Sequence, residues 1–342
     1  MPETTNDLSA NIQSLSTFRL PARAAEVIRI DHPDQLPKLP SSDRPELILG
    51  GGSNTVFLSD YPGRILLDRL QGLRFEALPG DKVRVVAAAG ESWHGLVRRC
   101  LDEGLHGIEN LALIPGTVGA APIQNIGAYG VELDQVFESL EAWDREARRW
   151  VTLDHDACAF AYRDSRFKSH EPDRYFITEV RLRLSRQFSP CLDYASLAEA
   201  LEQAETPEPT ARQLVAAILR LRRHRLPDPN RLANAGSFFK NPIVNESKLQ
   251  QALACMPDLA HWQLPDGRIK LAAGAMIEKL GFKGCHLSDT EDGIGIYKNH
   301  ALVLVNHGRG DANALKALIE QVQRAFVANF GIKLDAEPKL VG

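Results

Sequence analysis

Three short segments of this 342-residue chain combine side chains that can bind anions or move protons. The first is residues 161–168, where Arg163 stands among tyrosine, arginine and lysine. A guanidinium is always charged and can grip a carboxylate or phosphate through two parallel hydrogen bonds. The composition of this segment is equally typical of a solvated turn, so the residues alone leave both interpretations open.

The second segment, residues 234–242, reads Asn-Ala-Gly-Ser-Phe-Phe-Lys-Asn-Pro. Gly236 permits a sharp turn before Ser237, and the two phenylalanines that follow can exclude water from the serine hydroxyl. Ser237 is therefore a candidate proton donor or nucleophile. No Gly-x-Ser-x-Gly elbow surrounds it and no histidine–aspartate pair lies nearby in the sequence, which argues against a serine hydrolase.

The third segment, residues 334–338, brings the carboxylates of Asp335 and Glu337 close to the end of the chain. Acidic residues at such a position are most often solvated. The ten histidines show no metal-ligand spacing, and the five cysteines are scattered without a Cys-x-x-Cys pair. We therefore expect no metal site, no disulfide framework and a reducing compartment.

An uncharged stretch, residues 114–130, contains four glycines, three alanines and two prolines and fits neither a helix nor a strand. So many residues without large side chains indicate backbone packed closely against something flat or large. Gln124 and Asn125 can supply the few polar contacts that orient a ligand. We predict a buried loop around a cofactor; the alternative is a glycine-rich structural loop.

Glycines also follow the predicted strand at residues 47–49, where Gly-Gly-Gly-Ser-Asn occupies residues 50–54. Backbone N–H groups in a turn after a strand can converge on an anion. The segment matches neither G-x-G-x-x-G nor a P-loop, and a plain tight turn is as good an interpretation.

The elements that must position these groups are mostly short strands with few helices between them, which indicates an α+β fold. Residues 175–184 alternate apolar and polar side chains, as a half-exposed strand does. Helices are predicted where apolar residues recur with helical spacing: 93–101, 211–225, 272–280 and 313–330. The helix from residue 211 ends in Arg-Arg-His-Arg, which opposes the helix macrodipole.

Composition places the chain among ordinary globular proteins, with 44% hydrophobic residues, 25% charged residues and a net charge of −4. This balance does not favour nucleic acid or an acidic membrane surface as a partner. The N-terminus has neither a basic region nor an apolar run of the secretory type. Prolines and glycines in residues 111–131 argue against a membrane span there. We expect a cytoplasmic protein.

Taken together, residues 50–54, 114–130, 162–168 and 234–242 and Glu337 resemble the UDP-N-acetylenolpyruvoylglucosamine reductase family, flavin enzymes of bacterial peptidoglycan precursor synthesis. The resemblance covers almost the whole chain and implies an α+β, FAD-binding fold of the vanillyl-alcohol oxidase type. It implies one flavin-binding subdomain at residues 1–73, to which the tail 333–342 returns, and a second at 74–226. A substrate-binding domain would occupy residues 227–332.

The resemblance also implies a chemistry and its residues. NADPH would reduce non-covalently bound FAD, leave, and be replaced by enolpyruvyl-UDP-N-acetylglucosamine in the same cleft. Arg163 and Glu337 would stand beside the developing enolate and Ser237 would protonate the carbon. The FAD contacts implied by the match are Gly50, Gly51, Gly52, Ser53, Asn54, Thr55, Pro115, Gly116, Thr117, Gly119, Ala120, Ile123, Gln124, Asn125, Gly127, Ala128 and Tyr129.

For the substrate, the match implies contacts from Tyr162, Tyr194, Arg225, Lys240, Asn241 and His300. Tyr194 resembles the substrate-covering tyrosine of one subgroup of the family. Three positions depart from the family pattern: Arg225 replaces a lysine, His300 a polar amide or acid, and Pro338-Lys339 a Val-Arg pair.

Three alternatives to a reductase are open. A flavin oxidase of the same fold can tether its flavin covalently, and His94, Cys100 and His106 lie near the predicted flavin loop in the sequence. An inactive ligand-binding relative is disfavoured because all three catalytic positions are present. A nucleic-acid-binding protein would use residues 220–225, but this basic run is short and the chain is acidic overall. A monomer that acts on small molecules is expected.

Overall fold

The computed structural model describes residues 10–264, 266–287 and 293–342 and divides into two compact units. Unit 1 contains Ala24–Gly51 and Pro62–Arg222, and unit 2 contains Gly52–Tyr61, Arg223–Gly342 and the segment that ends at Arg23. Both predicted flavin-binding subdomains therefore fall largely in unit 1. The boundary predicted at residue 226 lies close to the observed division after Arg222.

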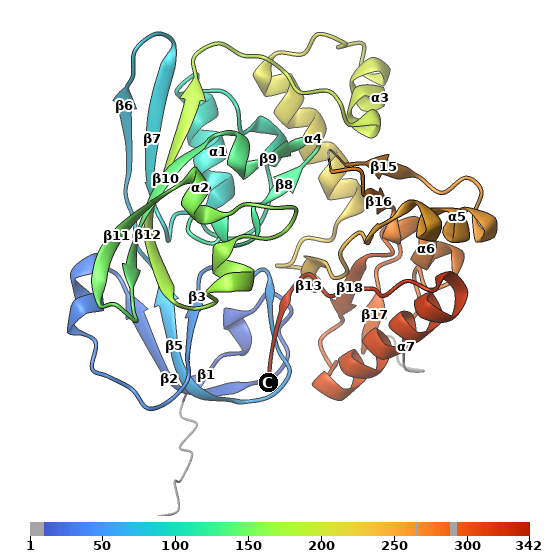
Figure 1. The fold of residues 1–342 in the computed structure, drawn as a ribbon, viewed down its shortest axis with the longest axis horizontal. Helices are drawn as coiled ribbons and strands as arrows, with labels where there is room; N and C mark the ends of the chain where they lie inside the picture. Colours follow the sequence, from blue (N-terminus) through green and yellow to red (C-terminus); the bar gives the residue numbers. More distant parts are fainter. Residues whose placement is uncertain (1–9, 265, 288–292) are drawn as a thin grey trace, which may run out of the picture. The chain divides into compact units, whose positions relative to one another are not determined.

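Unit 1 is built on a five-stranded antiparallel sheet in the order β11-β10-β12-β7-β6 (Figure 1). Its strands are β11 (Arg149–Asp154), β10 (Phe137–Asp144), β12 (Tyr175–Ser185), β7 (Lys82–Ala88) and β6 (Leu73–Ala77). The predicted strand at 175–184 is confirmed by β12, because alternating side chains suit a sheet with one buried face. The edge strand β6 was not predicted.

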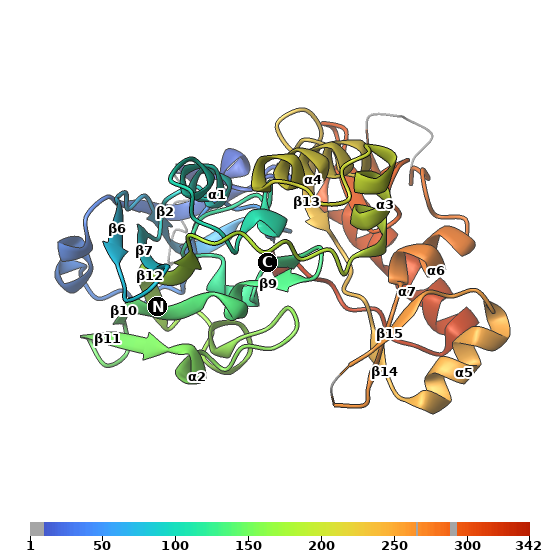
Figure 2. The same cartoon turned by 90° about the horizontal axis from the view of Figure 1, so that it is seen from above.

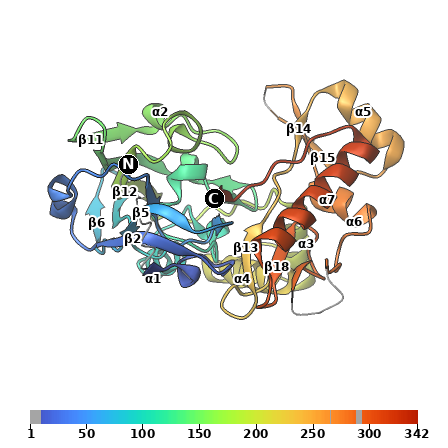
Figure 3. The ribbon, with the colours of Figure 1, turned by 90° about the horizontal axis from the view of Figure 1, so that it is seen from below.

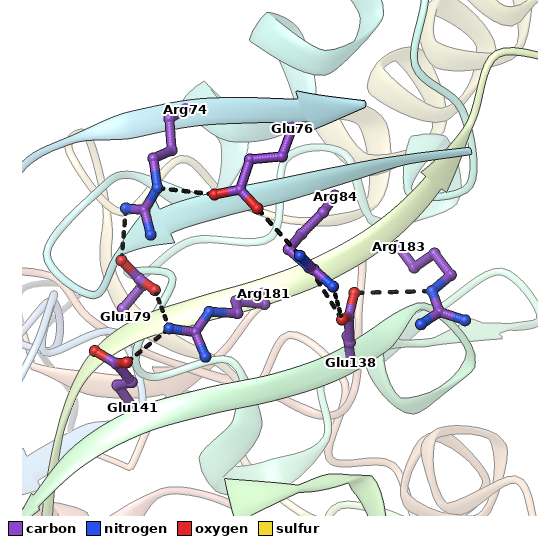
Figure 4. Close-up of polar contacts among 8 residues, drawn as sticks. All are labelled: Arg74, Glu76, Arg84, Glu138, Glu141, Glu179, Arg181 and Arg183. Carbon is purple, nitrogen blue, oxygen red and sulfur yellow. Dashed lines mark hydrogen bonds and ion pairs between the residues drawn. The ribbon is translucent and has the colours of Figure 1, made fainter. Parts of the chain in front are cut away.

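One face of this sheet is apolar and carries helix α1 (Trp93–Asp102), as Figure 2 shows. Trp93 and Leu96 of the helix pack in one core with Val85 of β7 and Leu182 of β12. The same sheet also carries charged side chains: arginines and glutamates of four strands pair with one another (Figure 4). These paired residues are Arg74, Glu76, Arg84, Glu138, Glu141, Glu179, Arg181 and Arg183.

A second sheet of unit 1 leads into the glycine turn. Its strands β2 (Arg23–Ile30), β5 (Tyr61–Asp68) and β3 (Glu46–Leu49) lie in the order β2-β5-β3, with β3 and β5 parallel. Strand β3 ends directly at Gly50, so the predicted strand and turn are both present. Leu66 of β5 packs with Trp143 of β10 in a small core of this unit.

Three helices complete unit 1: α2 (His155–Cys158), α3 (Ala195–Gln203) and α4 (Ala211–Arg225). Helix α4 confirms the prediction from residue 211 and buries Val215 and Ile218 in the main core. Helix α3 was not predicted.

Unit 2 contains the sheet β13-β18-β17, formed by β13 (Ala233–Ser237), β18 (Val303–Asn306) and β17 (Ile294–Ile296). Helix α7 (Ala312–Phe330) packs on it (Figure 3) and buries the apolar stripe that predicted it: Leu315, Leu318, Ile319, Val322 and Phe326. This unit therefore has a core of its own.

The rest of unit 2 consists of short elements. The sheet β14-β16-β15 contains β14 (Ile243–Val244), β16 (Ile269–Leu271) and β15 (His261–Gln263). Helices α5 (Glu246–Cys255) and α6 (Ala273–Lys279) accompany it.

The C-terminal tail forms β19 (Lys339–Val341), which pairs in parallel with β4 (Thr55–Phe57). This pairing explains why residues 52–61 belong to unit 2, although they were predicted to be part of the first flavin-binding subdomain. In the described part of the chain, no helix has the length and apolar character needed to cross a membrane.

Candidate active site

The uncharged stretch 114–130 is an irregular loop of unit 1, as predicted. It contains a single 3₁₀ turn at Pro122–Gln124 and the short strand β8 (Gly127–Ala128), which pairs with β9 (Val131–Glu132). Asn125 has a left-handed φ of 44° and is fully buried. Its Nδ2 donates to Glu132 Oε2 at 3.1 Å, and its Oδ1 accepts from Asp134 N at 3.0 Å. The Asn125 side chain therefore shapes the loop itself, and its predicted FAD contact stays a prediction.

The glycine turn after β3 lies directly against this loop. A Cβ atom on Gly50 would lie 2.4 Å from Thr117 Oγ1, and one on Gly51 would lie 3.0 Å from Gly116 Cα. The first distance is shorter than real Cβ contacts show and the second is tighter than most of them, so the close approach favours glycine at both positions. Two segments predicted to hold FAD are thus brought together within unit 1, although more than 60 residues separate them in the sequence.

One polar atom in this contact region has no partner. Thr117 Oγ1 is buried and makes no hydrogen bond to the described residues. A buried hydroxyl without a partner is unfavourable unless a ligand supplies one. A backbone cradle free of side chains, with a hydroxyl that needs a partner, fits a large flat cofactor with polar edges such as FAD.

The remaining glycine-turn residues belong to unit 2. Gly52 has a φ of +62°, and a Cβ there would lie 1.8 Å from Leu15 O. Its carbonyl accepts a hydrogen bond from Thr17 N at 3.1 Å, and Asn54 O accepts one from Lys339 N at 2.9 Å. The turn is therefore anchored to unit 2 from its third glycine onward. The FAD contacts predicted for Gly52, Ser53, Asn54 and Thr55, and those of the 114–130 loop, stay predictions.

Arg163 is held against the predicted flavin loop. Its Nη2 donates to Gly127 O at 2.6 Å and its Nη1 to Asn125 O at 3.4 Å. Glu132 Oε1 lies 3.7 Å from Nη1, and the guanidinium carbon lies 5.1 Å from the centre of the Tyr162 ring. The side chain is 18% exposed. The loop therefore presents a fixed, largely buried cation.

Two other residues of the 161–168 segment also form hydrogen bonds with this loop. Ser165 Oγ donates to Ile123 O at 2.6 Å, and Lys168 Nζ donates to Gln124 Oε1 at 3.1 Å. Ser165 is buried. These contacts favour the functional interpretation of the segment over the solvated turn.

Two further side chains of unit 1 lie at the end of the loop. The Tyr194 ring meets the Tyr129 ring edge to face at 5.2 Å between centroids and is 40% exposed. Arg222, in the last turn of α4, is close enough to Arg163 and Tyr129 for their charges to affect its pKa. Arg222 was not predicted as a site residue. Its spacing from Val215 and Ile218 places it on the inward stripe of α4, and this was the signal available in the sequence.

In unit 2, the chain's end runs beside the Ser237 segment. Glu337 N donates to Phe238 O at 2.8 Å, and Phe239 pairs with Ala336. Ser237 ends β13 directly after Gly236, whose φ is +71°. Ser237 Oγ makes no hydrogen bond to the other described residues. Two of the predicted catalytic residues, Ser237 and Glu337, are therefore held on neighbouring backbone segments.

His300 and Arg225 form a second group in unit 2. Burial, together with the charges of Arg225 and Lys283, lowers the pKa of His300 to about 4, while Glu278 opposes them. His300 Nδ1 accepts a hydrogen bond from Leu302 N at 3.2 Å. The imidazole is therefore neutral near pH 7, with its proton on Nε2, where it can donate to an anion.

Asn241 and Lys240 lie next to the Ser237 segment in sequence. Asn241 Oδ1 accepts from Ala273 N at 3.1 Å at the start of α6. The Asn241 Nδ2 group makes no hydrogen bond to the described residues and can donate to a ligand. Lys240 N donates to Asp335 O at 2.9 Å, which adds to the pairing with the chain's end. The substrate contacts predicted for both side chains stay predictions.

The three residues considered for a covalent flavin tether have other roles. Cys100 is fully buried, and burial raises the pKa of its thiol to about 12. His94 Nδ1 accepts from Leu113 N at 3.1 Å, and His106 Nδ1 lies 2.7 Å from Glu109 Oε1. A thiol that stays protonated is a poor nucleophile. The geometry thus disfavours the tethered oxidase.

Comparison with known proteins defines first the class and then the family. The model of an FAD binding domain matches residues 38–152, which places the chain among FAD-binding proteins. The model of the UDP-N-acetylenolpyruvoylglucosamine reductase C-terminal domain matches residues 228–341. The chain belongs to the UDP-N-acetylenolpyruvoylglucosamine reductase family.

Relatives match over nearly the whole length. The reductase of Cupriavidus pinatubonensis is 50% identical over 86% of this chain and 85% of its own. That of Ralstonia nicotianae is 45% identical over 95% of this chain and 96% of its own. The crystal structure of UDP-N-acetylenolpyruvylglucosamine reductase from Thermus caldophilus covers 97% of this chain and 98% of its own, with a TM-score of 0.65 at 23% identity. The predicted α+β, FAD-binding fold is confirmed.

Proposed function

We propose that this protein reduces the enolpyruvyl ether of UDP-N-acetylglucosamine to UDP-N-acetylmuramate, with NADPH as electron donor and bound FAD as carrier. The reaction would serve peptidoglycan precursor synthesis in the cytoplasm, carried out by a monomer. Relatives that carry the reductase name over most of both chains support this proposal. The structural observation that carries it is the Arg163 guanidinium, fixed by Gly127 O on the loop predicted to hold the flavin.

Each catalytic residue has a physical role in this reaction. Bound FAD would supply the hydride transfer from NADPH to the enolpyruvyl CH2 carbon. Negative charge then grows on the neighbouring carbon and its carboxylate, and a fixed cation such as Arg163 stabilises it most in a site that excludes water. Ser237 would protonate that carbon. Glu337 helps only when protonated or through a hydrogen bond, because a bare carboxylate repels the enolate.

Arg225 and His300 are proposed to hold the substrate's diphosphate. Arg225 offers a planar fork where the family pattern has the point charge of a lysine. His300 adds a neutral donor, since its pKa of about 4 keeps it uncharged at neutral pH. Tyr194, which contacts Tyr129 and is 40% exposed, is proposed to cover the bound nucleotide.

The test is a turnover assay with synthetic enolpyruvyl-UDP-N-acetylglucosamine and either NADPH or NADH, without oxygen. The purified protein is expected to be yellow, to release FAD on denaturation and to form a product heavier than the substrate by two hydrogens. A faster reaction with NADPH supports the proposed donor. A protein that forms no such product without oxygen, yet consumes oxygen when the assay is repeated in air, would be an oxidase instead.

A further inference from the structure

Strand β13 contains a bulge directly before Ser237. In its pairing with β18, Asn234 lies opposite Val305 and Ser237 lies opposite Val303. Three steps along β13 therefore match only two along β18, so β13 has one extra residue here. An extra residue turns the side chains that follow it onto the other face of the strand. Ser237 thus lies on the same face as Asn234, although residues three apart in a regular strand lie on opposite faces.

The Asn234 side chain holds this bulge in place. It is 4% exposed, and its Oδ1 accepts a hydrogen bond from Gly236 N at 2.9 Å. An asparagine that accepts from the N–H two residues further on imitates a backbone turn and fixes the chain between them. Gly236 adopts its φ of +71° there without strain. The backbone conformation that Asn234 stabilises is therefore the one that directly precedes Ser237.

The other polar groups of Asn234 are bonded as well. Its Nδ2 donates to Leu232 O at 2.8 Å and to Pro227 O at 3.2 Å. Its backbone N donates to Thr17 O at 3.1 Å, and its backbone O accepts from Thr17 Oγ1 at 2.6 Å. Leaving a buried polar group without its partner is unfavourable. The side chain therefore cannot turn away from Gly236 without losing several buried hydrogen bonds.

The backbone on the other side of Ser237 is also fixed. Phe238 N donates to Leu302 O at 2.7 Å, and Phe238 O accepts from Glu337 N at 2.8 Å. Ser237 thus lies between two anchored points, with Asn234 before it and Phe238 after it. The hydrogen bond from Gly236 to Asn234 fixes the short segment before Ser237 and, with it, the direction of the serine side chain.

We propose that Asn234 is a positioning residue, which directs the Ser237 hydroxyl toward the carbon that is protonated. The proposal rests on the proposed function, in which Ser237 is the proton donor. Proton transfer needs a donor at the right distance and angle, and a misplacement of about 1 Å can cost roughly 10²-fold in rate. Without the Asn234 oxygen, Gly236 would gain conformational freedom and Ser237 would lose its fixed direction.

The test uses the FAD-loaded protein with Asn234→Ala, and Asn306→Ala as the matched control. Asn306 is 3% exposed, donates to Phe18 O at 3.1 Å and accepts from Gly308 N, two residues further on, at 2.9 Å. It therefore holds the same kind of turn, at the opposite end of β18 from the residue that pairs with Ser237. Stopped-flow absorbance follows flavin reduction by NADPH and reoxidation by enolpyruvyl-UDP-N-acetylglucosamine separately.

Asn234→Ala is expected to slow reoxidation by roughly 10- to 100-fold. It should leave reduction by NADPH within about twofold of the wild-type rate, because this step needs no proton from Ser237. Asn306→Ala should leave both rates within about twofold, because it does not alter the donor. Asn234→Ser keeps an oxygen that accepts more weakly from Gly236 N, so its reoxidation rate should lie between those of the alanine variant and the wild type.

A double variant shows whether Asn234 acts through Ser237. When Ser237→Ala has already removed the hydroxyl, Asn234→Ala should slow reoxidation by less than about a further twofold, because the group it positions is gone. The same slowing with and without the Ser237 hydroxyl would overturn the proposal, and so would a wild-type reoxidation rate in Asn234→Ala. Where the alanine variant does not fold, Asn234→Ser replaces it, and reoxidation at the wild-type rate in that variant overturns the proposal too.

Amide hydrogen exchange at Gly236 tests the same contact without turnover. Exchange should be faster in Asn234→Ala by about tenfold or more, and unchanged in Asn306→Ala. Equal exchange at Gly236 in the two variants would show that Asn234 does not hold the turn. A wild-type protein whose reduced flavin is not reoxidised by the enolpyruvyl compound would contradict the proposed function, and the exchange at Gly236 would still decide whether Asn234 positions Ser237.

Discussion

Unusual backbone occurs at Arg163 and directly before Ser237, two of the proposed catalytic residues. Arg163 itself has a left-handed φ of 54°, which is uncommon for a residue with a side chain. Such a conformation costs roughly 1–3 kcal/mol and persists only where the surroundings enforce it. The hydrogen bonds to Gly127 O and Asn125 O supply that enforcement. At Ser237 the turn is taken by Gly236, which adopts its φ of +71° without this cost.

Ser237→Ala tests the proposed proton donor. NADPH is expected to bleach the flavin at the wild-type rate, because this step needs no proton from Ser237. Reoxidation by enolpyruvyl-UDP-N-acetylglucosamine should slow by roughly 10²–10⁴, the usual contribution of general acid catalysis. Stopped-flow absorbance separates the two half-reactions, with Ser247→Ala on the exposed start of α5 as the control. A normal reoxidation rate would remove Ser237 from the mechanism.

Asp68, at the end of β5, makes the stability of the fold depend on pH. Burial raises the pKa of Asp68 from 3.8 to about 7, against the effects of the Leu70 N–H and Arg69. Its folded-state pKa lies above its unfolded value, so the stability it contributes is complete below about pH 4 and is lost as pH rises through about 7.

Asp68→Asn should remove this loss and be more stable than the wild type at pH 8, by at most about 4 kcal/mol. The difference is expected to shrink steadily toward pH 4. Urea unfolding at several pH values between 5 and 8 measures it, with the exposed Asp43→Asn as the control. A difference that stays constant with pH would contradict the raised pKa of Asp68.

Among the elements, two kinds of contact stand out: the close backbone contact between the glycine turn and the 114–130 loop, and the ion pairs across the large sheet. The turn after β3 and the 114–130 loop touch through Gly50, Gly51, Gly116 and Thr117, where side chains would keep them apart. On the polar face of the large sheet, Arg84 reaches Glu76 at 3.1 Å and joins β6, β7 and β10 (Figure 4). The loop contact joins the two segments that are proposed to hold FAD, while the ladder links the strands of the sheet.

Gly50→Ala should therefore damage the cofactor site more than the fold. Its Cβ would lie 2.4 Å from Thr117 Oγ1, so the loop must move away from the turn. FAD affinity is expected to fall at least tenfold, measured by flavin retention on dialysis and by titration of the apoprotein. Gly274→Ala is the control, because its Cβ would meet Leu302 only at 3.5 Å, an ordinary contact. Equal FAD affinity in the two variants would show that the contact is unimportant for the cofactor.

At the scale of the whole molecule, the chain crosses between its two units several times. Residues 52–61 leave unit 1 after Gly51 and return to it at Pro62, and the tail pairs with them through β4 and β19. The proposed reaction divides its residues accordingly, with Arg163 in unit 1 and Ser237 and Glu337 in unit 2. Each unit has its own hydrophobic core.

FAD should stabilise the folded protein, because it binds the folded chain and not the unfolded one. At a free concentration 100 times its dissociation constant, the expected gain is about 2.7 kcal/mol. Thermal unfolding of the apoprotein with increasing FAD measures the rise in melting temperature. Gly50→Ala should need more FAD for the same rise. A melting temperature that does not respond to FAD would argue against a folded flavin site.

Local patterns in the sequence were enough for the long regular elements. The alternation of residues 175–184 predicted β12, and the apolar stripe of α7 predicted that helix, because both periods are set by backbone geometry. Motifs spread from Gly50 to Glu337 indicated the family. Elements such as β6 and α3 were missed, because a short segment holds too few residues to show a clear period.

The tertiary structure decided what those residues contact. Asn125, predicted as a cofactor ligand, uses its side chain inside the loop, and Arg222, interpreted as a charge at a helix end, lies close enough to Arg163 for that charge to lower its pKa. Residues 52–61 join unit 2 because β4 pairs with a tail almost 300 residues away. Such contacts depend on packing and pairing between distant segments, and no local periodicity in the chain encodes them.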